Sequence, residues 1–92
     1  MLDEVKLALR IKTSAFDSEI QSLIEAAKLD LKISGVNADR EDGLVKQAIL
    51  LYCKSLFGLG NPDKERYWNS YQMMVQHLKL SGDYGLPGEE TI

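Results

Sequence analysis

The sequence predicts an all-α protein: a small bundle of about four helices around a central, nearly all-round apolar third helix, with an irregular C-terminal tail. Apolar residues recur at helical spacing, about 100° per residue, in four segments that glycine, proline and polar turns separate. Within residues 42–58, the polar strip of such a helix narrows to Gln47 and Lys54, with Lys46 further round. A helix of this kind must be covered on nearly every side, either by its own domain or by neighbouring copies.

The first two predicted helices occupy residues 2–9 and a segment that begins after Ser14 or Asp17 and runs to about Ile33. The first is too short to be stable alone, and its apolar side consists of Leu2, Val5, Ala8 and Leu9. Ser14 or Asp17 is expected to cap the second helix, because a short polar side chain there accepts the free amides of the first turn. This helix is expected to end at Ser34-Gly35, where glycine permits a left-handed closing residue. Its core stripe is Ile20, Leu23, Ile24, Ala27 and Leu31.

The third and fourth predicted helices follow a polar loop and a Gly-Pro turn respectively. Asp39 or Asp42 is expected to cap the third helix, which ends at Gly58. The fourth is expected to begin at Pro62 behind Asn61, since proline fits the first helical position, and to continue to Leu80. Its core stripe is Tyr67, Trp68, Tyr71, Met74, Val75 and Leu78. Aromatic residues at helical spacing are usually core, and no basic groove accompanies these three to suggest base stacking.

Two of the helices carry apolar residues on a second side. Leu29 and Ile33 lie away from the core stripe of the second helix, and Met73 and Leu80 lie away from that of the fourth. Single exposed apolar residues are normal on a monomer. Because the pattern recurs in two helices, however, we predict that these four residues form subunit contacts.

Length and composition fit one small domain, residues 1–82, followed by a flexible tail, residues 83–92, in which Tyr84 and Leu86 are candidates to dock on a neighbour. The chain has 92 residues and a net charge of −3, which does not fit a nucleic-acid binder that depends on phosphate contacts. No signal-peptide pattern is present, and no apolar stretch approaches the roughly 20 residues that span a bilayer. We therefore expect a soluble intracellular protein with no membrane partner.

The sequence predicts no catalytic, cofactor-binding or metal-binding residues, so no enzyme is expected. His77 has no second histidine or cysteine beside it that would complete a metal site. Cys53, the single cysteine, lies in the most apolar segment and is expected to be a buried, inert thiol. The loop before the third helix alternates acids as a calcium loop does, but it has Asp42 and Ala48 where a glycine and an acid are required.

The order of these features resembles the small head-tail connector proteins of tailed bacteriophages and prophages, also called DNA-packaging or head-completion proteins. The resemblance covers residues 2 to about 84 and consists of apolar and turn positions rather than a catalytic signature. Its elements are Leu9-Arg10-Ile11, Phe16-Asp17-Ser18-Glu19-Ile20, Ile24-Glu25-Ala26-Ala27, Val45-Lys46-Gln47-Ala48-Ile49-Leu50-Leu51-Tyr52, Tyr67-Trp68 and Leu78-Lys79-Leu80.

The resemblance implies a structural virion protein that forms a ring of about a dozen copies, in which one face of each subunit meets a different face of the next. Its implied partners are other copies of itself, the portal protein, and a tail-side connector or stopper protein. DNA would pass through the ring without sequence-specific binding. The implied location is the virion neck, with the host bacterial cytoplasm as the site of assembly.

Two other functions are compatible with the sequence. A small helical DNA-binding regulator fits the size, although the acidic balance and the missing basic recognition helix oppose it. A helical adaptor subunit that binds one protein partner is the second alternative. Stoichiometry distinguishes the adaptor from a ring-forming protein.

Overall fold

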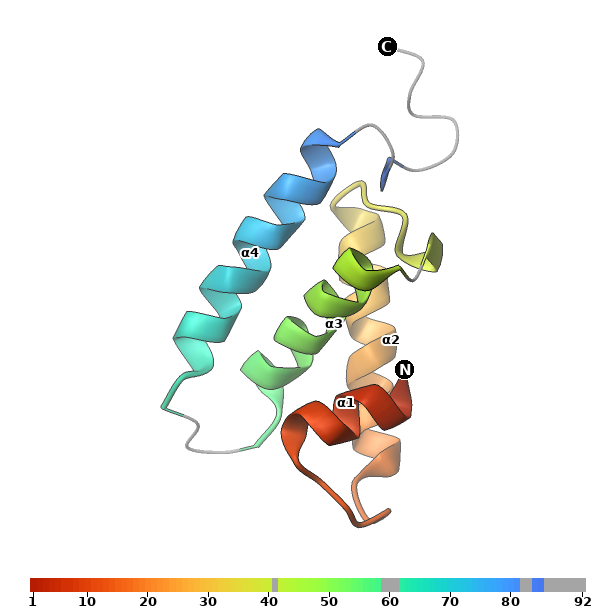
Figure 1. Ribbon diagram of the computed structural model, residues 1–92, viewed down its shortest axis with the longest axis vertical. Helices are drawn as coiled ribbons and strands as arrows, with labels where there is room; N and C mark the ends of the chain where they lie inside the picture. The colour runs from red at the N-terminus through yellow and green to blue at the C-terminus, as the bar shows by residue number, and fades with distance from the viewer. Residues whose placement is uncertain (41, 59–61, 82–83, 86–92) are drawn as a thin grey trace.

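Four α-helices make up most of the described chain, with the third in the middle. The computed structural model describes residues 1–40, 42–58, 62–81 and 84–85. Helix α3 lies between α2 and α4, and α1 packs against α2 and α3 (Figure 1). The all-α prediction is therefore confirmed. The helices are α1 (Leu2–Leu9), α2 (Asp17–Ile33), α3 (Gly43–Leu56) and α4 (Lys64–Leu80), and a 3₁₀ turn (Ala38–Arg40) precedes α3.

Helix α3 supplies the centre of the core, as its composition predicts. Val45, Ala48, Ile49 and Cys53 are fully buried between the flanking helices. Coverage is incomplete at both ends, where Leu44 and Leu56 are 40% and 39% exposed. The other buried apolar residues are Val5, Ile20, Ile24, Ala27, Leu31, Val36, Ala38, Tyr71, Val75 and Leu78.

A hydrogen bond connects the two helices that flank α3. Tyr71 of α4 is fully buried, and its hydroxyl donates to Oδ2 of Asp30 on α2. Burial raises the pKa of Tyr71, and the hydrogen bond to Asp30 raises it further. The ring of Tyr71 also packs against Tyr52 and Trp68, with ring centroids 5.2 and 5.4 Å away. Tyr71 thus joins all three long helices, and its predicted place in the core is confirmed.

Helices α1 and α2 end in the same backbone motif but with different residues. In both, the closing residue adopts a left-handed conformation: Arg10 with φ 61° after α1, and Gly35 with φ 91° after α2. The next amide then bonds back five residues, from Ile11 to the Lys6 carbonyl and from Val36 to the Leu31 carbonyl. Glycine takes this conformation without steric conflict, whereas arginine does so at a cost of about 1 kcal/mol.

Asp42 joins the start of α3 to the end of the described chain. Its Oδ1 accepts hydrogen bonds from the amides of Leu44 and Val45, both at 3.1 Å, so it is the N-cap that the sequence allows. Its Oδ2 accepts a hydrogen bond from the Tyr84 hydroxyl. One carboxylate therefore stabilises the start of a helix and holds a residue 42 positions later in the chain.

We expect Asp42→Ala to lower the free energy of unfolding by about 2 to 4 kcal/mol, because it removes both the helix cap and the partner of a tyrosine hydroxyl. Urea unfolding followed by circular dichroism measures the change. Asp42→Asn keeps an oxygen acceptor for the cap, so it should lose less than half as much. Equal losses in the two variants would show that the carboxylate charge, rather than the acceptor, provides the stabilisation.

The boundaries or caps of three helices differ from the prediction. Helix α3, which was expected to end at Gly58, ends at Leu56. The N-cap residue of α2 is Phe16, with no side-chain cap; Ser14 does not cap the helix, and Asp17 pairs instead with Lys6 of α1 at 2.7 Å. Helix α4 begins at Lys64, two residues after the expected start, because Pro62 and Asp63 form a turn.

Of the tail predicted for residues 83–92, the structure describes Tyr84 and Gly85. In the described residues, no helix combines the length and hydrophobicity that crossing a membrane requires.

Candidate assembly surfaces

The first candidate surface, called here the α2 surface, consists of Leu29 and Ile33. These side chains are 58% and 77% exposed, and they lie one turn apart on the same side of α2. The buried stripe of α2, with Ala27 and Leu31, faces the other way. Beside Leu29, a groove of about 470 Å³ is lined by Glu25, Lys28, Leu29, Lys32, Asn37, Ala38 and Asp39. The α2 surface is thus an apolar ridge next to a polar groove.

The second candidate surface, called here the α4 surface, consists of Met73 and Leu80. They are 74% and 87% exposed on the side of α4 that faces away from its buried residues. Met73 also borders a mainly apolar groove of about 550 Å³ between α3 and α4. The lining residues of that groove are Leu44, Gln47, Leu51, Ser70, Met73, Met74 and His77.

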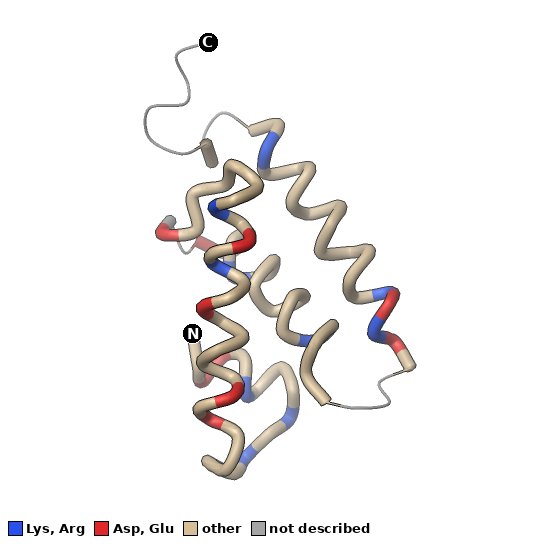
Figure 2. Tube along the Cα trace, turned by 180° about the vertical axis from the view of Figure 1, so that it is seen from behind, with Lys and Arg blue, Asp and Glu red and all other residues tan. Residues whose placement is uncertain are grey.

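The helices that carry these surfaces differ in the sign of their charge. Helix α2 has four acids and two lysines, and Figure 2 shows the acids spaced along its length. Helix α4 has two lysines and one arginine but only one acid. The two helices lie on different sides of α3. Helix α2 therefore has a net charge of −2 and α4 of +2, which are complementary over the whole helices, while the groove beside Leu29 is lined by two lysines as well as two acids.

The four helix residues are exposed on the subunit, whereas the predicted tail residue Tyr84 packs on its own chain. Tyr84 is half-buried against the core of its own chain, its carbonyl accepts from the Asn37 amide at 2.8 Å, and Gly85 forms a β-bridge with Val36. Tyr84 therefore contacts its own domain, since Asp42 also holds its hydroxyl. Leu86 lies outside the described residues.

Besides Leu44 and Leu56 at the ends of α3, two further exposed large apolar side chains of the described residues were not among the predicted contacts. Leu7 on α1 is 80% exposed, and the sequence signal for it was available, since Leu7 lies off the stripe that Val5 defines. Phe16 is 45% exposed but packs edge-on against Phe57 at 5.8 Å between ring centroids. Leu7 is therefore the more isolated of the two and serves below as a control position.

Cys53 and His77 are the residues whose side chains could act as a nucleophile or a metal ligand, and the structure places neither in such a site within the residues that it describes. Cys53 is fully buried, and burial raises the pKa of its thiol to about 12. His77 is exposed on α4 at the edge of the α3/α4 groove. Among the described residues, no three histidine, cysteine or acidic side chains converge as a metal site would require.

We expect Cys53 to resist alkylation while the protein is folded, because the thiolate is the reactive form and the raised pKa keeps the thiol protonated. Iodoacetamide at pH 8.5 should modify the urea-unfolded chain at least 100-fold faster than the native chain, as followed by intact mass. Because burial raises the pKa of the folded thiol to about 12, the protection should be complete near pH 9 and should weaken as the pH rises toward 12. Rapid modification of the native chain at pH 8.5 would contradict the burial of this thiol.

A helical domain that displays apolar side chains on two different helices is typical of a component of a larger assembly. The chain belongs to the phage connector protein family, whose sequence model matches residues 1–85. This confirms the resemblance described above. Membership makes the chain a structural, virion-associated protein that works with other proteins of the phage head or tail. No curated protein and no solved structure matches the chain significantly.

Proposed function

We propose that this protein forms a ring at the junction of the phage head and tail, between the portal protein and a tail-side connector or stopper. The observation that carries the proposal is the pair of exposed apolar surfaces on α2 and α4. In a closed ring with rotational symmetry, each subunit offers one surface to the neighbour before it and a different one to the neighbour after it. The α2 and α4 surfaces supply two such surfaces.

The charges support a contact between unlike surfaces. Helix α2 carries two more acids than bases and α4 two more bases than acids, so contact between two copies of the same helix would bring like net charges together. Contact between α2 and α4 would pair opposite net charges, with the apolar side chains of the two surfaces between them. This arrangement repeats head to tail, which is the geometry of a ring.

The overall charge fits a channel through which DNA moves. The chain carries 14 acids against 11 lysines and arginines. Tight DNA binding requires many phosphate contacts from basic residues. A ring with a mildly acidic balance would allow the duplex to pass without retaining it.

The mass of the assembled particle tests the ring. We expect light scattering and negative-stain microscopy to show closed particles of many subunits, either at high protein concentration or after addition of the portal protein of the same phage. A helical adaptor for one partner would instead remain a monomer or form a complex with one copy. Persistent monomers under all of these conditions would exclude the ring.

A DNA-binding test addresses the remaining alternative, a helical regulator. A gel-shift series should show no complex with a short duplex at 150 mM salt and at most weak binding at low salt. A regulator would bind a preferred duplex tightly, and its affinity would fall steeply with added salt.

A further inference from the structure

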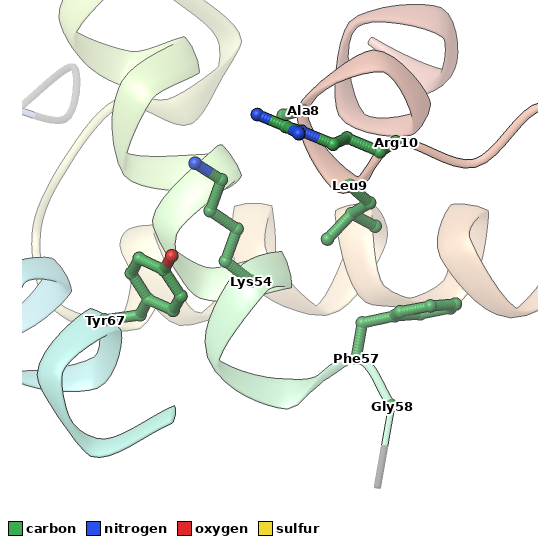
Figure 3. Close-up of a pocket in the computed structure, with 7 residues that line it drawn as sticks. All are labelled: Ala8, Leu9, Arg10, Lys54, Phe57, Gly58 and Tyr67. Carbon is green, nitrogen blue, oxygen red and sulfur yellow. The ribbon is translucent and has the colours of Figure 1, made fainter. Parts of the chain in front are cut away.

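A pocket at the end of the molecule opposite Tyr84 brings two cationic side chains together. It has a volume of about 460 Å³ and lies between the end of α1, the end of α3 and the first turn of α4. Arg10 and Lys54 point toward one another across it, and the Tyr67 hydroxyl points the same way (Figure 3). Its lining residues, none of them acidic, are Ala8, Leu9, Arg10, Lys54, Phe57, Gly58 and Tyr67.

The backbone at Arg10 indicates that this side chain has a use beyond closing α1. Arg10 holds the left-handed conformation that Gly35 holds in the equivalent motif after α2. A non-glycine residue there is strained, and such strain is concentrated at functional positions. The guanidinium group makes no ion pair with any carboxylate in the described part of the chain.

The shape and composition of the pocket favour a side-chain carboxylate as its ligand. Two cationic side chains directed into one recess create a positive potential that attracts an anion. Arginine and a tyrosine hydroxyl donate to carboxylate oxygens with good geometry. Leu9 and Phe57 form apolar walls that suit the methylene stem of a glutamate. Duplex DNA, a wide rigid rod, could touch only the rim of such a recess.

From the cationic and apolar lining of the pocket, and from Arg10 above all, we infer that it binds a glutamate from the segment 86–90 of a second copy of the chain. The segment reads Leu86-Pro87-Gly88-Glu89-Glu90, so it offers an apolar residue and two acids to a pocket with apolar walls and two cations. The inference deepens the proposed function and rests on it in one respect, since it requires copies to be neighbours. It assigns a charged contact in addition to the α2 and α4 surfaces.

The reach of the chain favours a second copy over the same copy. Gly85 is fixed by its bridge to Val36, beyond the end of α2, at the end of the molecule where α4 also finishes. From Tyr67 at the pocket to Leu80, α4 alone rises about 20 Å. Five extended residues after Gly85 cover at most about 18 Å. The segment of the same chain would therefore have to be fully stretched along α4, whereas a neighbour's segment can enter from outside.

A labelled peptide tests the pocket directly. A fluorescein-labelled peptide of residues 84–92 is titrated with the full chain, and binding is followed by fluorescence anisotropy. We expect the Arg10→Gln, Lys54→Gln double variant to bind the peptide at least tenfold more weakly than the wild type. Lys12→Gln with Lys64→Gln removes two exposed cations outside the pocket and should change the affinity less than twofold. Equal binding by both double variants, or no binding by the wild type, overturns the inference.

Arg10→Gly separates the role of the side chain from that of the backbone. Glycine relieves the left-handed strain, so the urea midpoint should rise, while peptide binding should fall at least fivefold. Loss of both stability and binding would indicate a merely structural residue. Addition of a short DNA duplex should not displace the peptide, and displacement by the duplex would assign the pocket to phosphate instead.

A cross-linking measurement on the full chain distinguishes the two sources of the glutamate. Nitrogen-14 and nitrogen-15 forms are mixed under assembling conditions and treated with a carbodiimide, which joins a lysine amine to a carboxylate. We expect peptides that link Lys54 to Glu89 or Glu90, about half of them with one light and one heavy partner. Links within single chains only would overturn the second-copy assignment. Because the peptide titration needs no ring, its result is independent of whether the ring itself is found.

Discussion

Replacement of Ile49 by aspartate is expected to remove a large part of the protein's stability, enough to unfold it at 25 °C if the wild type lies at the lower end of the range for its size. Ile49 is fully buried at the centre of α3, and the described residues around it are apolar. Aspartate there would leave a cavity and a carboxylate without a partner, a combination that costs more than about 4 kcal/mol. A domain of this size is stable by only about 5 to 14 kcal/mol. Circular dichroism should show most of the helical signal lost, or a midpoint shifted by tens of degrees.

Two matched leucines make the result interpretable. Leu7→Asp changes a side chain that is 80% exposed and should alter the free energy of unfolding by about 0.5 kcal/mol or less. Leu51 is half-buried beside the α3/α4 groove, so Leu51→Asp should fall between the other two variants. If Ile49→Asp retained its helical signal and melted like Leu7→Asp, the central position of α3 would be wrong.

The position of Leu51 shows where periodicity stops being informative. On a helix that is apolar nearly all round, spacing alone treats Leu51 and Ile49 as equivalent. Their burial differs because α4 crosses one side of α3 and leaves a groove there. On α2 and α4, where polar residues separate two apolar sides, every buried residue lies on the core stripe that spacing predicted, whereas the stripe residues Leu23, Tyr67, Trp68 and Met74 are half-buried. Spacing also identified Leu29, Ile33, Met73 and Leu80 as lying off the core stripes, and all four are exposed on the single subunit.

The contacts that the sequence did not reveal depend on pairs of distant residues. Arg10 and Lys54 are 44 positions apart in the chain and meet only because α1 packs against α3. The Tyr84–Asp42 hydrogen bond joins residues of two separate connections. No local pattern specifies such pairs. One local signal was present, however: the predicted first helix closes with an arginine where glycine is the usual residue, so Arg10 is unusual on sequence grounds as well.

If the α2 surface of one subunit contacts the α4 surface of the next, two double variants, one on each surface, should give a distinctive assembly pattern. One variant, Leu29→Lys with Ile33→Lys, replaces the apolar side chains of the α2 surface by cations, which would face α4, a helix of net positive charge. A second variant, Met73→Asp with Leu80→Asp, replaces the apolar side chains of the α4 surface by acids, which would face α2, a helix of net negative charge. Under conditions in which the wild type forms rings, each variant alone should remain monomeric, because every contact would include one altered surface. All four positions are exposed, so circular dichroism should show a folded subunit in both variants.

A mixture of the two variants should behave differently from either one alone. The first variant keeps an intact α4 surface and the second keeps an intact α2 surface, so together they can form a single native contact. In that dimer, the surfaces left unpaired are the altered α2 surface of the first variant and the altered α4 surface of the second, and neither has its apolar side chains. Exposed lysine–aspartate pairs between such surfaces contribute only about 1 kcal/mol or less each and are screened at 150 mM salt. Growth therefore stops at a dimer with one copy of each variant.

Light scattering of an equimolar mixture at 150 mM salt should accordingly show twice the subunit mass, whereas the wild type forms larger closed particles. If instead one variant dimerised by itself, its remaining surface would bind its own kind, and the contact would be isologous rather than ring-forming. If Leu7→Asp, with both surfaces intact, also failed to assemble, α1 would belong to the interface and the two-surface description would be incomplete.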